Sequence, residues 1–148
     1  MPEIRGGIVV AGPAAAAQAL WADPARWPNI VDDFRAVISA DPGWPEEGRV
    51  VWQSTPSGRV REIERVVVWS DGLQVLDIED DKTKATQTAV FQEKSDGVEF
   101  SLTLKYRLKN GNPAMKIVDL LFIRRSLRDS LLRSLRRFAA EREGDLSL

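Results

Sequence analysis

The sequence contains neither cysteine nor histidine. Without cysteine there are no disulfides, no thiolate nucleophiles and no sulfur-ligated metals. Without histidine the commonest general base is missing, together with Ser-His and Cys-His catalytic pairs and the imidazole ligands of most zinc and iron sites. Any chemistry must therefore use Asp, Glu, Lys, Arg, Tyr or Ser, and neither a metal site nor a cofactor is predicted.

Long apolar runs and a strong net charge are also missing. No stretch of the 148 residues approaches the roughly 18 uncharged apolar residues that a membrane span needs. The segment from Met1 to Gly6 lacks the basic and apolar regions of a secretory signal, so a soluble cytoplasmic protein is expected. The formal net charge of -1 provides no field that would attract nucleic acid, which is not an expected partner.

The N-terminal part predicts a strand followed by bent helical pieces. Ile4 to Val10 is rich in β-branched residues and ends at a Gly-Pro boundary. Ala14 to Phe34 has high helical propensity, but Asp23-Pro24 predicts a new helix start and Trp27-Pro28 interrupts the pattern. Two or three short helical pieces are therefore expected here instead of one rod.

The middle of the chain predicts an antiparallel sheet. Its β-rich runs are separated by short turns, which make neighbouring strands antiparallel. In the last run apolar and polar residues alternate from Val98 to Leu108, so one face is buried and the other is wet. The predicted strands are Arg35–Ala40, Arg49–Thr55, Val60–Trp69, Leu73–Ile78, Lys84–Glu93 and Val98–Leu108.

A long helix is predicted at the C-terminal end. Asn112 is a plausible N-cap before Pro113, and Gly144 marks the far end. Apolar residues recur at spacings of three and four and form a stripe that must face the sheet. The fold class is therefore α+β, with a curved antiparallel sheet of about seven strands in the order β-α-α-β6-α around a long C-terminal helix. The stripe consists of Ile117, Leu120, Leu121, Ile123, Leu127, Leu131, Leu135 and Phe138.

The order of these elements carries a resemblance to a known superfamily. Together with Pro13 and the segment from Leu20 to Pro28, which contains D-P-x-R-W-P, it resembles the START-like helix-grip superfamily (SRPBCC) over about residues 4–142. It is most similar to the bacterial polyketide cyclase/dehydrase and lipid-transport group. The resemblance implies one START-like ligand-binding domain over residues 1–148. It predicts the fold more strongly than the activity, because members of the superfamily share a fold but differ in activity.

A curved sheet cannot lie flat on a straight helix, so a gap is expected between them. Period-two alternation predicts which side chains line this gap, although the same side chains could pack together as a dry core. The predicted ligand-binding residues are Trp27, Phe34, Trp52, Ile63, Arg65, Val67, Trp69, Gln87, Ala89, Phe91, Phe100, Leu102, Leu104, Tyr106, Leu120, Ile123 and Leu127.

Few polar residues share the predicted inner face. Arg65 could lie at the solvent edge or point inward and bind a carboxylate or phenolate oxygen. Aromatase/cyclase members of the superfamily typically place an arginine deep on this strand, whereas Val67 and Trp69 take the deeper positions here. The acidic stretch Asp77, Glu79, Asp80 and Asp81 lacks a metal-loop pattern and is interpreted as a solvated turn.

Three classes of function remain open. The leading one is a carrier or binder of an apolar lipid, quinone or polyketide-like molecule, without catalysis. The second is a polyketide cyclase or dehydratase in which Tyr106 or Arg65 would be catalytic. The third is a protein-interaction module with an exposed Trp44 and an arginine-rich C-terminal helix, which would bind an acidic protein partner or form a homodimer. The helix carries Arg124, Arg125, Arg128, Arg133, Arg136, Arg137 and Arg142.

Overall fold

The computed structural model describes residues 2–54, 60–109, 113–118 and 122–147. Its element order agrees with the sequence prediction, because each predicted strand is present within a few residues of its expected bounds. The elements are β1 (Glu3–Val10), α1 (Ala14–Trp21), the 3₁₀ helix η1 (Pro24–Asn29), β2 (Phe34–Ala40), β3 (Arg49–Ser54), β4 (Val60–Ser70), β5 (Leu73–Glu79), β6 (Thr83–Lys94), β7 (Gly97–Leu108), α2 (Pro113–Val118) and α3 (Arg124–Leu146).

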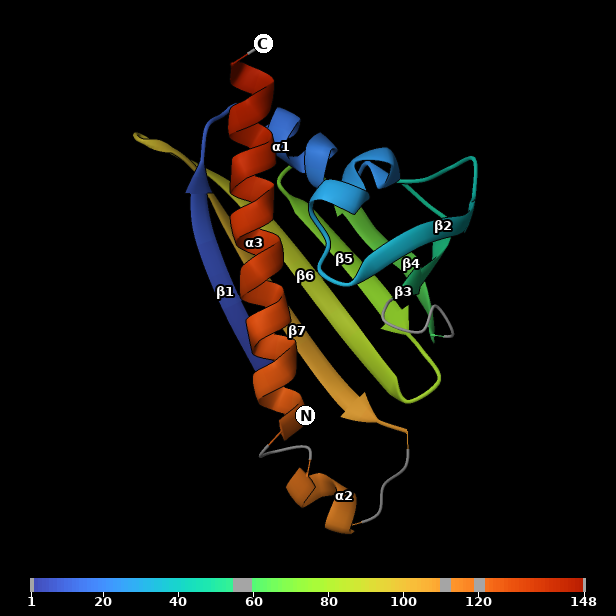
Figure 1. Cartoon of the computed structure of the whole chain (residues 1–148). Coiled ribbons are helices and arrows are strands. Elements are labelled where there is room, and N and C mark those ends of the chain that lie inside the picture. The colour runs from blue at the N-terminus through green and yellow to red at the C-terminus, as the bar shows by residue number, and fades with distance from the viewer. Residues whose placement is uncertain (1, 55–59, 110–112, 119–121, 148) are drawn as a thin grey trace.

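Within the described ranges the strands form one curved, seven-stranded antiparallel sheet (Figure 1). Its order is β1-β7-β6-β5-β4-β3-β2, so the N-terminal strand pairs with the last strand, and the remaining strands follow each other as a meander. The alternation predicted for β7 is confirmed, because Val98, Phe100, Leu102 and Tyr106 are buried on one face. The fold is therefore α+β, with the sheet curved around the C-terminal helix α3.

The helical pieces before β2 cover one end of the sheet. Asp23 caps η1, because its Oδ1 accepts a hydrogen bond of 3.0 Å from Ala25 N. Trp27 is held by a hydrogen bond of 2.9 Å from its Nε1 to the carbonyl of Trp21. Arg26 lies beside the last turns of α3, where its Nη2 is 2.6 Å from both Glu141 Oε1 and Asp145 Oδ1. The D-P-x-R-W-P segment thus joins η1 to α1 and to α3.

Among the strands, α3 packs mainly on β1, at one edge of the sheet. Gly6 permits this close approach, because a Cβ at this position would lie 2.6 Å from Leu131 Cδ2 and 2.8 Å from Leu135 Cδ1. On the side that faces the sheet, the helix buries its own Leu131, Leu135 and Phe138. The helix is therefore seated on the edge of the sheet, and its inner stripe faces the concave side.

The C-terminal helix is shorter than predicted. The structure has α2 and α3 as separate elements, with α2 beyond the end of the sheet (Figure 1). Ile117 is accordingly 62% exposed and does not face the sheet. The 23 residues of α3 extend about 34 Å, close to the length of about 40 Å of the 12-residue strand β7. The helix α3 alone therefore spans nearly the full length of the sheet, and α2 lies outside that span.

Two packed clusters occupy the concave side of the sheet. In the larger one Phe100 stacks on Phe91 with ring centroids 4.4 Å apart and meets Phe138 at 5.0 Å and Trp21 at 4.9 Å. In the smaller one, which includes Trp27 and Val50, Phe34 stacks on Trp52 at 5.4 Å. No helix in the described ranges is both long and apolar enough to cross a membrane.

Candidate functional site

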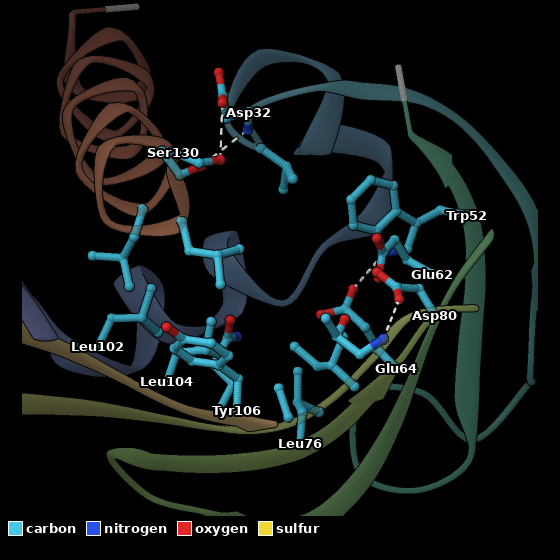
Figure 2. Close-up of a pocket in the computed structure, with 18 of the residues that line it drawn as sticks. Asp32, Trp52, Glu62, Glu64, Leu76, Asp80, Leu102, Leu104, Tyr106 and Ser130 are labelled. Carbon is cyan, nitrogen blue, oxygen red and sulfur yellow. Dashed lines mark hydrogen bonds between the residues drawn. The ribbon is translucent and has the colours of Figure 1, made fainter. Parts of the chain in front are cut away.

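A cavity of about 200 Å³ lies between the sheet and α3 (Figure 2). One water molecule needs only about 10–15 Å³ of such space, so the cavity has room for a small organic molecule. Its floor and far wall come from the central strands, and Leu127 and Leu131 of α3 close it from above. The apolar lining consists of Trp21, Trp27, Val31, Trp52, Leu76, Ile78, Ala85, Leu102, Leu104, Leu127 and Leu131.

The cavity exists because the helix and the two packed clusters leave the middle of the sheet uncovered. Among the strands, α3 packs mainly on β1, while β4, β5 and β6 curve away toward the opposite edge (Figure 1). Ala85 of β6, which pairs with Ile78 and Tyr106, leaves space above the sheet because its side chain is a single methyl group. A small residue on a curved inner face therefore contributes directly to the open volume.

One wall of the cavity is acidic. Glu62 and Glu64 project inward from β4, and Asp80 lies beside them at the end of β5 (Figure 2). Glu64 is buried and accepts a hydrogen bond of 2.8 Å from Trp52 Nε1. Asp80 also organises the turn, since its Oδ1 accepts hydrogen bonds of 2.8 and 2.7 Å from the backbone nitrogens of Lys82 and Thr83.

Burial makes both glutamates poor acids. Loss of solvent raises the pKa of Glu62 to about 8, and the negative charge of Asp80 and a hydrogen bond to it raise this pKa further. Loss of solvent likewise raises the pKa of Glu64 to about 7, against the opposing effect of the Trp52 hydrogen bond. Near neutral pH this wall therefore holds at least one proton, so it can donate as well as accept hydrogen bonds.

The opposite wall holds a different kind of carboxylate. Asp32 lies between η1 and β2, and Arg133 of α3 binds it through two hydrogen bonds, of 3.1 and 2.9 Å. Ser130 Oγ donates to Asp32 at 2.9 Å, and Asp32 N donates to Ser134 Oγ at 2.9 Å. The Arg133 hydrogen bond lowers the pKa of Asp32, with a smaller contribution from the charge of Arg137. Asp32 therefore fastens α3 over the cavity as a stable anion.

The structure brings some of the residues predicted for the pocket together around this cavity. Seven of them line this cavity: Trp27, Trp52, Gln87, Leu102, Leu104, Tyr106 and Leu127. Phe34, Ala89, Phe91 and Phe100 share the inner face but belong to the packed clusters. Ile123 does not line the cavity, and Leu120 lies outside the described residues.

The face predicted for β4 was wrong over most of its length. Glu62 and Glu64 line the cavity, so alternation places Ile63 and Arg65 on the outer face. Val67 sits at a bulge between Val66 and Val68 and is 54% exposed. Beyond the bulge Trp69 pairs with Gln74 and returns to the inner face, although it does not line the cavity. One extra residue in the strand reverses the alternation, and the sequence pattern does not reveal it.

Several lining residues were not among the sequence predictions for the site. Gln74, Leu76 and Ile78 follow period two along β5 and were identifiable by that signal. Glu62 and Glu64 alternate equally well, but charged residues are normally assigned to the wet face. The others are Trp21, Val31, Asp32, Asp80, Thr83, Ser130 and Ser134, whereas alternation and helical spacing had already indicated Ala85 and Leu131.

Two surface features have specific internal roles. Trp44, predicted to be exposed, donates a hydrogen bond of 2.7 Å to the carbonyl of Ala22 and packs edge-on against Trp27. Arg142 of the arginine-rich helix binds the carbonyl oxygens of Ala11 and Gly12 at 3.1 and 2.9 Å.

In the described part of the chain no group of three or more acidic side chains is arranged to hold a metal ion.

Comparison with solved structures identifies the architecture. TTHA0849 from Thermus thermophilus superposes with a TM-score of 0.77 at 21% identity, covering 99% of this chain and 100% of that one. A START superfamily protein from Mycobacterium smegmatis superposes at 0.75 with 13% identity, covering 96% and 97%. The fold is the START-like helix-grip fold. The resemblance predicted from element order and from the D-P-x-R-W-P segment is thereby confirmed at the level of fold.

A cyclase structure shows the same fold. The di-domain ARO/CYC protein StfQ of the steffimycin biosynthetic pathway superposes with a TM-score of 0.75 at 16% identity. The match covers 99% of this chain and 52% of StfQ. No protein-family model and no curated protein matches the sequence.

Proposed function

We propose that this protein binds and carries an apolar small molecule in the cavity between its sheet and α3. The observation that carries the proposal is the cavity itself, with about 200 Å³ of space under a mainly apolar wall. Such a wall favours burial of an apolar body at about 25 cal/mol for each Å² removed from water. The polar groups on the same wall can orient a ligand.

Native mass spectrometry of the freshly purified protein tests this proposal. We expect a retained apolar compound whose mass disappears on denaturation. The Ala85→Phe variant should lose it, because a phenyl ring on this position fills the floor of the cavity. Ala140→Phe adds the same bulk on an exposed position of α3 and should retain the compound. Equal retention by both variants contradicts binding in this cavity.

A polyketide cyclase or dehydratase acting in the same cavity is the second candidate. The observation that favours it is the pair of inward glutamates with raised pKa values, near a wall that also contains Tyr106. A protonated carboxyl could act as a general acid on a folded ketone chain. Arg65, predicted as a catalytic residue, lies on the outer face and takes no part in such a site.

Turnover of a linear poly-β-ketone thioester distinguishes the two candidates. A cyclase should convert it, and Glu64→Gln and Tyr106→Phe should each lower kcat at least tenfold without lowering the temperature of thermal unfolding. A carrier should bind the thioester without converting it, and the same variants should change only its affinity. Absence of conversion by the wild-type protein rejects the cyclase candidate.

A further inference from the structure

The charges that line the cavity are all of one sign. The described residues of its wall include four acidic residues, Asp32, Glu62, Glu64 and Asp80, and neither lysine nor arginine. Asp32 already has Arg133 and Arg137 as partners on α3. Arg61 and Arg65 belong to the same strand as the glutamates but are exposed on the opposite face. None of the described lining residues therefore supplies a positive charge to Glu62 or Glu64.

This arrangement discriminates between ligands by charge. Once the glutamates are ionised, a carboxylate or enolate placed in the cavity would be repelled by Glu62, Glu64 and Asp80. It would also find no cation among the described lining residues to replace the water it loses. An ammonium group would instead form charge-assisted hydrogen bonds with the glutamates. Such a pair would lie in a site with little water, where its attraction is screened less than at a surface.

A second, independent feature points to a ligand. The side chain of Gln74 lines the same cavity, is 1% exposed, and has no hydrogen-bond partner for its Nε2 among the described residues. A buried donor without a partner carries an unfavourable free energy, so this amide is suited to an oxygen acceptor inside the cavity. A ligand with an ether or hydroxyl oxygen would supply that acceptor.

We propose that the cavity recognises an apolar amine: an ammonium group held by Glu62 and Glu64, an aromatic or aliphatic body over Leu76, Leu102 and Leu104, and an oxygen acceptor toward Gln74. This inference rests on the proposed function and narrows its ligand class. It reverses the expectation from the sequence, in which an inward Arg65 would have favoured an anionic ligand. Figure 2 shows the glutamates and the leucines around the same open space.

Three probes with one skeleton test the inference. They are 2-(6-methoxynaphthalen-2-yl)ethylamine, the corresponding alcohol, and 6-methoxy-2-naphthylacetic acid, each titrated by calorimetry at pH 8, where a primary amine is still charged. We expect the amine to bind at least tenfold more tightly than the alcohol, and the acid to bind most weakly.

Matched variants locate the recognition. The double variant Glu62→Gln/Glu64→Gln should lower amine affinity at least tenfold and change alcohol affinity less than threefold. The variant Glu99→Gln/Glu143→Gln removes the same charge from exposed positions and should bind all three probes like the wild type.

The possible failures are separable. Tighter binding of the acid or the alcohol than of the amine overturns the amine inference and leaves the apolar carrier proposal intact. Equal loss of amine and alcohol binding in the glutamine variant also overturns it, because the carboxylates would then act only by shaping the cavity. Absence of binding by all three probes overturns the carrier proposal, and the amine inference falls with it.

Discussion

Two acidic walls face each other across one cavity, and they differ in what surrounds them. Asp32 is bound by Arg133, Arg137 and the hydroxyl of Ser130. Glu64 accepts only an indole N–H among the hydrogen bonds described for its side chain. The same functional group therefore has a lowered pKa on the first wall and a raised pKa on the second. The first carboxylate holds the fold together, while the second is available to a ligand.

The difference follows from where the cations lie. The arginines of α3 that reach Asp32 come from the helix that covers the cavity, so the first wall closes the structure. The strand that carries Glu62 and Glu64 places its own arginines on the outer face. Stability therefore depends on the first wall, while the second wall reduces it whenever its glutamates ionise.

The largest expected effect comes from removing the anion of the first wall. Asp32→Asn leaves Arg133 and Arg137 without their shared carboxylate and should lower the free energy of unfolding by about 2–3 kcal/mol at pH 7. Urea denaturation measures this loss. Asp129→Asn, an exposed change on α3, is the control and should shift stability by less than about 0.5 kcal/mol.

The pH dependence of that effect has a definite sign. Because the folded pKa of Asp32 is lowered, its contribution is complete above the unfolded value of about 3.9 and is lost as pH falls through the folded value. The difference between wild type and Asp32→Asn should therefore shrink below about pH 4. A difference that stays constant down to about pH 2 would show that the charge is not responsible.

An intermediate effect of opposite sign is expected on the second wall. Folded pKa values of about 8 for Glu62 and about 7 for Glu64 lie above the unfolded value of about 4.3, so stability is lost as pH rises from that unfolded value to the folded values. Glu62→Gln/Glu64→Gln should remove this loss and stabilise the protein by about 1–3 kcal/mol at about pH 8.5, with little change at about pH 3.5, below the unfolded pKa. Thermal unfolding at both pH values checks it, and equal shifts at the two would refute the assignment.

The smallest effect concerns the one described hydrogen bond that favours the ionised form of Glu64. Trp52→Phe removes the Nε1 donor and should raise the pKa of Glu64 by less than about one unit. Carboxyl carbon NMR titration measures it. Trp44→Phe removes an indole that binds a backbone carbonyl elsewhere, and it should leave the Glu64 titration unchanged. A fall in the Glu64 pKa in Trp52→Phe would mean that solvent entry outweighs the lost donor.

The sheet and the order of elements could be predicted from the sequence because they depend on local patterns. Alternation in β7, the Asp23 cap and the short turns each encode a feature that the structure retains. The sheet register then follows from one hairpin to the next. The position of α2 beyond the end of the sheet (Figure 1) was not predictable in this way, because the apolar spacing includes Ile117, which is exposed.

The site was predictable only where alternation stayed regular. Trp52, Gln87 and Tyr106 were assigned correctly to the inner face from strands whose pairing is uninterrupted. Glu62 and Glu64 were missed because these inner residues of β4 are charged, whereas the apolar Ile63 between them faces outward. Asp32 was missed because its role depends on the rotation of α3, which brings Ser130 and Arg133 to it from about 100 residues away.

The bulge at Val67 has a consequence for how this protein could diversify. It divides β4 into two stretches that present opposite parities to the interior. The residues beside the cavity and those near Ser70, whose carbonyl accepts a hydrogen bond from Gln18 of α1, therefore follow separate alternations. Substitutions at 62 and 64 can change the charge of the cavity without altering which residues face inward beyond the bulge. A single additional residue thus lets the cavity-facing residues of one strand vary independently of the inward residues beyond the bulge.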